Sequence, residues 1–202
     1  MLWLILGAVI LLLTLFLINF YKDPKRGIPK GNNIVAPADG KIISIIDTSK
    51  DEIRIKKGIL GKIKTMTKDV AKECCVISIF MSPLDAHINR APISGTIKSI
   101  KHTKGTFFKA YDLEKSFENE KNEIIIQNKK LKIKIKIVQI AGFLARRIIC
   151  NIKKNQKVNK GAKIGMIALG SLTTLIIPKG VELKIKLNDK VKAGSTIIAN
   201  LK

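Results

Sequence analysis

The chain of 202 residues is poor in the side chains that build most metal and redox sites, with two histidines and three cysteines. Two histidines, His87 and His102, exclude any site that needs three imidazole ligands, and no metal site is expected. The cysteines lack the C-x-x-C spacing of zinc sites, and the neighbours Cys74 and Cys75 would face opposite ways on a strand. We therefore expect buried, reduced cysteines and no disulfide framework.

Acidic and aromatic residues are also few: Asp+Glu number 15 against Lys+Arg 38, and aromatic residues make up 5% of the chain. Only five of the basic residues are arginines, so no arginine cluster for base recognition is present. Because no RNA- or DNA-binding motif is found either, no nucleic-acid partner is expected. The formal net charge of +23 reflects a compositional bias toward Lys and Ile, or attraction to an anionic membrane surface.

A long apolar run occupies residues 1–20, which are apolar except for Thr14 and Asn19. At about 1.5 Å per residue this run reaches the ~30 Å hydrocarbon core of a bilayer, so a membrane-spanning helix is predicted. A cleaved signal peptide is the alternative, but the run lacks a basic start and a small-residue cleavage site. Residues 21–32 then form a basic linker, and the positive-inside rule places the domain at 33–202 on the cytoplasmic side of the cell membrane.

From residue 33 onward the chain consists of short Ile- and Val-rich runs separated by Gly and Pro. Several runs alternate apolar and polar residues, most clearly at 131–137 (LKIKIKI), which predicts strands with one solvated face. Only residues 111–122 lack this alternation and are interpreted as a polar loop with a helical turn. The domain is therefore expected to be mainly β.

An internal repeat lies near the C-terminus, where residues 152–164 match residues 185–197 at seven of 13 positions with a constant offset of 33. Each copy has the order strand, Asn-x-Lys turn, Gly-containing turn, strand. This order is similar to the hammerheads of lipoyl-type and hybrid barrel-sandwich domains. We expect a duplicated, lipoyl-like barrel-sandwich whose two copies flank a hairpin containing residues 169–171. The alternative is that similar turns simply reuse Gly and Asn.

Within that expected hairpin, the pair Gly170-Ser171 lies between the apolar runs GMIAL and TTLIIP. Taken alone, such a pair is an ordinary turn. However, seven segments along the chain resemble, in order, the phosphatidylserine decarboxylase family, and particularly its short prokaryotic branch with the archaetidylserine decarboxylases. These segments are Tyr21–Arg26, Val35–Lys41, Phe80–Pro92, Gly105–Phe108, Asn119–Asn122, Val138–Arg147 and Gly165–Ser171.

The resemblance implies a proenzyme that cuts its own backbone between Gly170 and Ser171. The two chains, 1–170 and 171–202, would stay together as a heterodimer. Ser171 would become a pyruvoyl group, a covalent cofactor that acts as an electron sink in the way pyridoxal phosphate does. The implied reaction is decarboxylation of phosphatidylserine or archaetidylserine to the ethanolamine phospholipid.

Self-cleavage requires a base that accepts the proton of Ser171 Oγ while this oxygen attacks the preceding carbonyl. We interpret His87 as that base and Asp39 as its orienting carboxylate, in a Ser/His/Asp constellation. The alternatives are a packed core histidine and an ordinary turn aspartate. Large bacterial relatives carry a second histidine where this chain has Arg90, so His87 serves both self-cleavage and decarboxylation, or His102 supplies the second imidazole.

The phosphodiester of such a lipid requires cations, and guanidinium groups match phosphate oxygens best. The candidates are Arg90, Arg146 and Arg147, with structural salt bridges as the alternative for the last two. Leu172 stands where many short members of the family have an arginine. A different class of function is a non-catalytic, membrane-tethered lipoyl-like module, although a lipoyl carrier would present a lysine where this chain has LGSLTT.

Overall fold

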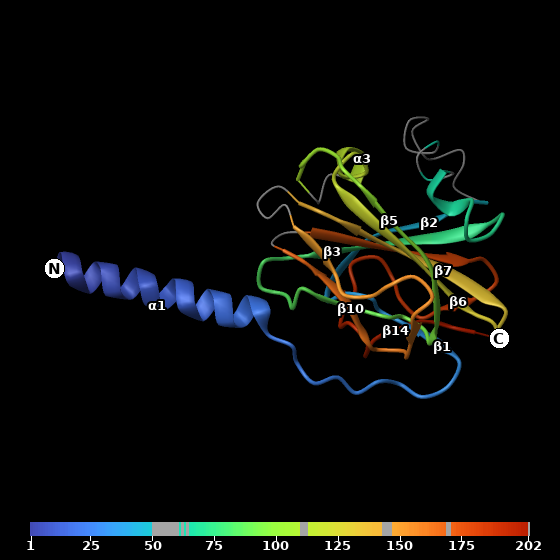
Figure 1. Cartoon of the computed structure of the whole chain (residues 1–202), viewed down its shortest axis with the longest axis horizontal. Helices are drawn as coiled ribbons and strands as arrows, with labels where there is room; N and C mark the ends of the chain where they lie inside the picture. Colours follow the sequence, from blue (N-terminus) through green and yellow to red (C-terminus); the bar gives the residue numbers. More distant parts are fainter. Residues whose placement is uncertain are drawn as a thin grey trace.

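The computed structural model describes residues 1–49, 61, 63, 65–109, 113–142, 147–168 and 171–201. A single long helix, α1 (Leu2–Tyr21), projects from one end of a β domain, to which an extended linker connects it (Figure 1). This helix is long and apolar enough to cross a membrane, and its most apolar window is not buried against the domain. The expected N-terminal apolar helix and mainly β domain are therefore confirmed.

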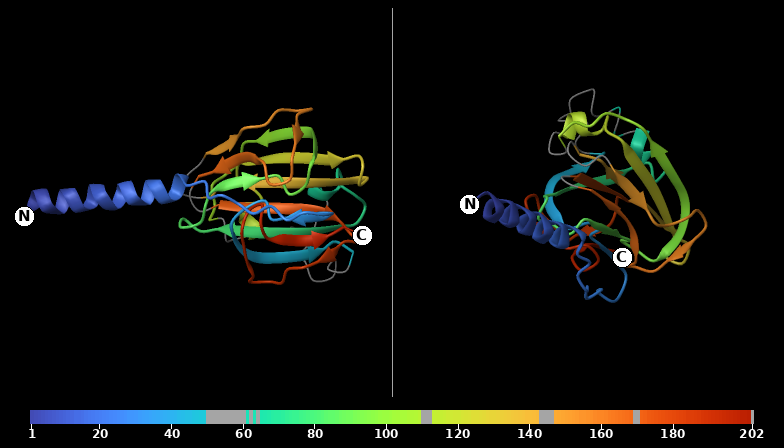
Figure 2. Two further views of the ribbon diagram at one scale, coloured as in Figure 1. Left: turned by 90° about the horizontal axis from the view of Figure 1, so that it is seen from below. Right: turned by 60° about the vertical axis from the view of Figure 1, so that its left-hand side comes forward.

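The β domain is built around an eight-stranded sheet with the strand order β13-β2-β3-β11-β7-β6-β5-β9, in which neighbours are antiparallel. The sheet curls around the interior of the domain (Figure 2). Its strands are β2 (Gly40–Asp47), β3 (Cys74–Met81), β5 (Gly95–Thr103), β6 (Lys121–Asn128), β7 (Ile133–Ile140), β9 (Lys157–Val158), β11 (Ser171–Pro178) and β13 (Lys190–Val191).

Two three-stranded sheets pack against the concave side of the main sheet, and a short helix, α3 (Leu113–Ser116), precedes β6. One has the order β1-β14-β12, with β1 (Asn33–Val35), β14 (Ile197–Asn200) and β12 (Glu182–Leu183). The other has the order β4-β10-β8, with β4 (Ile88–Arg90), β10 (Lys163–Ile167) and β8 (Ile148–Cys150). Isoleucines from all three sheets form one core, as their strand periodicity requires.

The opposite, convex face of the main sheet carries a second apolar cluster that includes Met66, Val138 and Ile176. Adjacent residues of one strand belong to different clusters, since Cys74 lies in the convex cluster and Cys75 in the concave core. All three cysteines are free, and Cys74 and Cys75 are buried. The predicted buried, unpaired state is confirmed for this pair, whereas the prediction of burial is wrong for Cys150, which is only partly buried.

The prediction of a solvated face for 131–137 is wrong at Lys136, which is fully buried. Its Nζ donates to the Met66 carbonyl oxygen at 2.7 Å and lies 3.0 Å from Asp69 and 3.3 Å from Glu123. The segment around Met66 covers the convex face here, so the ammonium finds its partners inside the protein. The alternation of apolar and polar residues within one strand cannot show that a segment distant in sequence, here the one around Met66, packs on its polar face.

The two copies of the repeat have the same backbone conformation at equivalent positions. Asn155 and Asn188 have φ of 68° and 74°, and Gly161 and Gly194 have φ of 82° and 76°. The expected hairpin around residues 169–171 is not formed by the flanking strands: β10 pairs with β4 and β8, whereas β11 pairs with β3 and β7. The chain therefore passes from one sheet to another between Ile167 and Ser171.

Candidate active site

Ser171 is the first residue of β11, a central strand of the main sheet, and it is fully buried. It faces the concave core together with Thr173, because both alternate with Leu172, which belongs to the convex cluster. Its Oγ donates to the thioether sulfur of Met81 at 3.5 Å. A thioether is a weak acceptor, so this hydroxyl is held loosely. Gly170 lies outside the described residues.

His87 lies just before β4 and is fully buried. Its Nδ1 is 2.8 Å from the carbonyl oxygen of Asp85, which can only accept, so Nδ1 carries the proton and Nε2 keeps a free lone pair. This Nε2 is buried and has no hydrogen-bond partner among the residues that the structure describes. Burial lowers the pKa of the imidazole, although the Asp85 carbonyl and the charges of Asp85 and Asp39 oppose that effect. The side chain is therefore a neutral base at neutral pH.

A hydrogen bond places His87 near the segment that leads to Ser171. The backbone amide of Ile167 donates to the carbonyl oxygen of His87 at 3.3 Å. Ser171 follows four residues later, and four residues span at most about 14 Å when fully extended. Ser171 and His87 therefore lie at the same end of the domain, where the ring of Phe20, near the end of α1, packs on His87.

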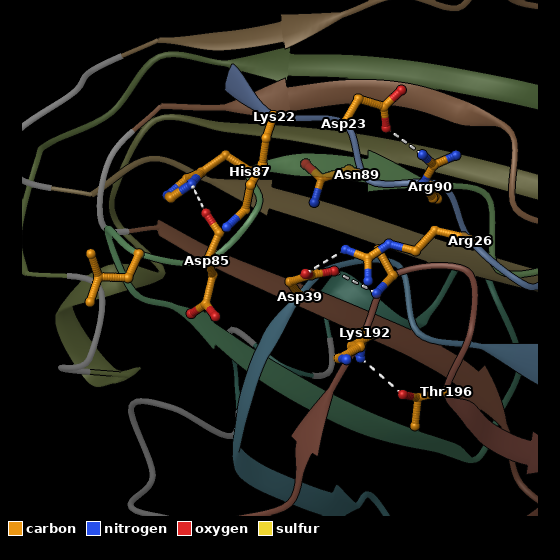
Figure 3. A network of polar contacts seen from close by, with 12 residues as sticks. Lys22, Asp23, Arg26, Asp39, Asp85, His87, Asn89, Arg90, Lys192 and Thr196 are labelled. Carbon is orange, nitrogen blue, oxygen red and sulfur yellow. Dashed lines mark hydrogen bonds and ion pairs between the residues drawn. The ribbon is translucent and has the colours of Figure 1, made fainter. Parts of the chain in front are cut away.

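The structure does not join Asp39 to His87 by a hydrogen bond. The Asp39 carboxylate accepts from Arg26 Nη2 at 2.6 Å and from the backbone amide of Ala193 at 2.7 Å. Figure 3 shows Asp39 directed toward Arg26, while the His87 ring lies beside Asp85. Asp39 thus acts on the imidazole through its charge, and the backbone of Asp85 orients the ring.

His102 lies apart from these groups, on β5. Its side chain is 48% exposed, and its Nε2 is 3.3 Å from Glu120. The strand β5 is separated from β11 by β6 and β7, which corresponds to about 14 Å at ~4.8 Å per strand. His102 is therefore not positioned as the partner of Ser171.

The three candidate phosphate ligands have different surroundings. Arg90 forms an ion pair with Asp23, and its Nη1 donates to the carbonyl oxygen of Gly161 at 2.8 Å. Arg147 is exposed, and within the described part of the chain its side chain forms no ion pair. Arg146 lies outside the described residues.

Sequence reasoning missed a chain of buried amides that ends beside Ser171. Asn122 Nδ2 donates to Gln139 Oε1 at 2.9 Å, and Gln139 Nε2 donates to Asn89 Oδ1 at 2.8 Å. Asn89 Nδ2 then donates to Thr173 Oγ1 at 3.2 Å. Each amide fixes the orientation of the next, so the donors all point toward Thr173.

Thr173, at the end of this chain of amides, and Ser171 share one hydrogen-bond acceptor. Thr173 Oγ1 donates to the sulfur of Met81 at 3.3 Å, and Ser171 donates to the same sulfur. The available signal in the sequence was a polar residue inside an apolar run, such as Gln139 in IVQIAG. The arrangement as a whole provides a buried hydroxyl, a neutral base and ordered amide donors, which is a set suited to acyl transfer.

Comparison with known proteins agrees with this chemistry. The model of a family described as phosphatidylserine decarboxylase matches residues 13–199. A protein of Methanocaldococcus jannaschii, named provisionally as an archaetidylserine decarboxylase proenzyme, is 44% identical over 93% of this chain and 90% of its own length. The phosphatidylserine decarboxylase proenzymes of Chlorobium limicola and Ehrlichia canis are 38% and 40% identical over 93% and 98% of this chain, and 80% of each relative is covered.

Proposed function

The chain belongs to the phosphatidylserine decarboxylase family, which are carboxy-lyases, and from this premise we propose that it converts a serine phospholipid to the ethanolamine phospholipid. The candidate substrates are phosphatidylserine and archaetidylserine, the serine phospholipids that appear in the names of the relatives. Both relatives are proenzymes by name, which supports a precursor that is processed.

We propose that the precursor cuts itself between residues 170 and 171. The observation that carries this proposal is a loosely held, buried Ser171 hydroxyl at the same end of the domain as His87, whose Nε2 has no partner in the described part of the chain. In this step Ser171 Oγ attacks the carbonyl carbon of residue 170, His87 accepts the hydroxyl proton, and the C–N bond breaks. The protonated imidazole returns that proton to the leaving nitrogen.

The resulting ester is resolved by elimination. A base removes the α-proton of residue 171, and the carboxylate of residue 170 leaves as the new C-terminus of the large chain. Addition of water then releases ammonia and leaves a ketone at the start of the small chain. This ketone is the pyruvoyl group, the proposed cofactor.

The residues around Ser171 fit such a group. The position is fully buried, and Thr173 and the Asn89 amide are the polar neighbours that would hold the group. When present, the group supplies an electron sink for the electrons that remain when a carboxylate leaves as carbon dioxide. His87 Nε2 is the proposed proton donor to the carbon that loses the carboxylate, after it has taken up a proton.

The membrane arrangement is likewise a proposal. α1 would anchor residues 1–20 in the cell membrane, and the cations of the linker at 21–32 would hold the domain at 33–202 on the cytoplasmic side. The site would then lie at the surface where lipid head groups are found. Arg147, exposed and adjacent in the chain to β8, is the best placed phosphate ligand, with Arg146 beside it in sequence.

Two structural proposals complete the assignment. The chains 1–170 and 171–202 form a heterodimer, because the second chain supplies β11 to the middle of the main sheet. The similar, positive φ values of the paired asparagines and glycines support a duplicated lipoyl-like barrel-sandwich.

The test is Ser171→Ala in the full chain, produced in membranes. We expect a single uncut band on a denaturing gel and no ethanolamine lipid from vesicles that contain phosphatidylserine or archaetidylserine. Ser78→Ala is the matched control, because Ser78 is also a buried serine on the main sheet, with Thr174 as its partner at 3.3 Å. Efficient cutting of Ser171→Ala at 170/171 would reject Ser171 as the nucleophile.

A further inference from the structure

Residues 20–28, here called the strap, connect α1 to the β domain and pack directly on the candidate site. Phe20, on the last turn of α1, is 2% exposed, and its ring centroid is 4.3 Å from that of His87. One residue earlier, Asn19 Nδ2 donates to the Leu84 carbonyl oxygen at 3.4 Å. The end of the helix thus covers the base and contributes to the burial that lowers the pKa of His87.

The middle of the strap is tied to β4 and β10 by charge. Asp23 forms an ion pair with Arg90 (Figure 3) and a second one with Lys163. Burial opposes the ionisation of Asp23, but the hydrogen bonds and charges of Lys163 and Arg90 outweigh it and hold the pKa of this carboxyl below its usual value. Arg90 is therefore engaged by the strap, which makes it a weaker candidate for a lipid phosphate.

The end of the strap is seated on the two glycines of the repeat. A Cβ added to Gly161 would lie 2.4 Å from Ile28 Cδ1, and one added to Gly194 would lie 3.1 Å from the same atom. Both glycines also have positive φ, so any side chain would be strained there. Ile28 thus fills a slot that exists only because both copies of the repeat carry glycine.

Between these two fixed points, Arg26 reaches Asp39. The Arg26 and Asp39 side chains are 9% and 13% exposed, and the two join at 2.6 Å. The Arg26 Nε is buried and finds no hydrogen-bond partner within the described ranges of the chain. Burying nine-tenths of a guanidinium costs folding free energy unless an opposite charge compensates it or the charge serves a function.

We propose that the strap contributes to the function of the site, in addition to connecting α1 to the β domain, and that Arg26 is a positioning residue. Arg26 fixes the Asp39 carboxylate and balances its charge, and it thereby sets the electrostatic field in which His87 acts. This role rests on the proposed self-cleavage at 170/171. It gives a function to the segment Tyr21–Arg26, which the reaction chemistry does not otherwise use.

The direction of the effect follows from the charges around His87. The charges that act on the ring are those of Asp85, from its own loop, and Asp39, just before β2. Arg26 lies against Asp39, and Lys22 is the other nearby cation of the strap (Figure 3). Removing the Arg26 cation leaves Asp39 unbalanced, which favours the protonated imidazole and raises the pKa of His87. A base must be neutral, so self-cleavage then needs a higher pH. Removing the Asp39 anion instead leaves the Arg26 cation unbalanced. This change disfavours the protonated imidazole and lowers the pKa of His87, so self-cleavage then proceeds at a lower pH.

The experiment measures self-cleavage against pH in the full chain, synthesised without cells in the presence of lipid nanodiscs. The readout is the fraction cut at 170/171 on a gel, so it does not depend on decarboxylation. We expect Arg26→Ala to move the pH of half-maximal cutting upward by about one unit, and Asp39→Asn to move it downward. Arg26→Lys should return the midpoint toward the wild-type value, because it restores the charge.

The matched control is Lys30→Ala, which removes the same charge from an exposed position of the same linker beyond the strap. It should leave the midpoint unchanged. An unchanged midpoint in Arg26→Ala, or an equal shift in Lys30→Ala, would overturn the role of the strap. If Arg26→Ala does not fold, Asp39→Asn decides alone, because the absence of a downward shift overturns the proposal. If wild type is never cut, the proposed function itself fails, and the role of the strap fails with it.

Discussion

At the scale of single residues, the site depends on how one imidazole is held. The Asp85 carbonyl oxygen fixes the tautomer of His87 and so leaves Nε2 as the basic atom. Burial, to which the Phe20 ring contributes, favours the neutral imidazole, and it outweighs the hydrogen bond to the Asp85 carbonyl, which favours the charged form. The geometry therefore suits a group that first accepts a proton and then returns it.

This leads to a prediction for the two histidines. His87→Ala should block self-cleavage, and His102→Ala should mature normally, because His102 lies on β5 and pairs with Glu120. In wild type, cutting should persist below pH ~6.5, the ordinary histidine pKa, and fall only at lower pH, since burial lowers the pKa of His87. Gels of each variant across pH check this. Full cutting of His87→Ala together with an uncut His102→Ala would reverse the assignment.

At the scale of elements, other parts of the chain pack on both faces of the main sheet, and different interactions hold them on the two faces. The concave side packs isoleucines from three sheets, whereas the segment around Met66 is tied to the convex side by a buried lysine. The Lys136 ammonium hydrogen bond holds the pKa of Asp69 below its usual value against the opposing effect of burial. Lys136, on β7, thus holds the segment around Met66 against the sheet. The alternation of apolar and polar residues in β7 does not predict this contact.

Lys136→Met should lower the free energy of unfolding by about 2 kcal/mol, because it leaves Glu123 without its partner. The loss is smaller than for a fully buried ion pair, since the side chain of Asp69 is 44% exposed. Urea unfolding of the uncut Ser171→Ala chain, followed by circular dichroism, measures it. Lys134→Met, two residues earlier on the same strand, is the control. The Asp69 contribution should be present above pH ~3.9 and be lost as pH falls through its lowered folded pKa. Equal stability of Lys136→Met and the control would contradict this account.

The long strands could be predicted from the sequence, and the short ones could not. Runs such as CCVISIFM and NEIIIQ carry their own alternation or apolar content, and they became β3 and β6. By contrast, β4 and β8 have three residues each and exist only because β10 lies between them. The expected hairpin around 169–171 failed for the same reason, since strand partners are set by the whole domain.

The same division holds for the site. Ser171 and His87 could be identified because a hydroxyl and an imidazole are the groups that the chemistry implied by the family resemblance requires. Asn89 and Gln139 could not, because their meaning depends on two strands from different sheets meeting at 2.8 Å. Arg26 was likewise missed, since only the folded linker brings it to Asp39.

At the scale of the whole molecule, the proposed cut falls where the chain changes sheets. The residues after the cut supply β11, which pairs with β3 on one side and β7 on the other, and β14, which pairs with β1 and β12. These ladders and the buried isoleucines they carry do not depend on the peptide bond between 170 and 171. The small chain is therefore an integral part of the core.

The two chains should consequently remain associated without a covalent link. We expect chains 1–170 and 171–202 to elute together from a sizing column in mild detergent and to separate only in strong denaturant. Because the described cysteines are free, reducing agent should make no difference. Release of the small chain under native conditions would contradict the placement of β11.

The most direct test of the central claim is an intact-mass measurement of the purified wild-type protein. The account predicts two masses, divided between residues 170 and 171, with the smaller chain beginning in a ketone and therefore lacking a free amino terminus. It also predicts that hydroxylamine, which reacts with ketones, increases the mass of the smaller chain alone. A single mass of the full chain, or a small chain that begins with an unmodified serine amine, would contradict it.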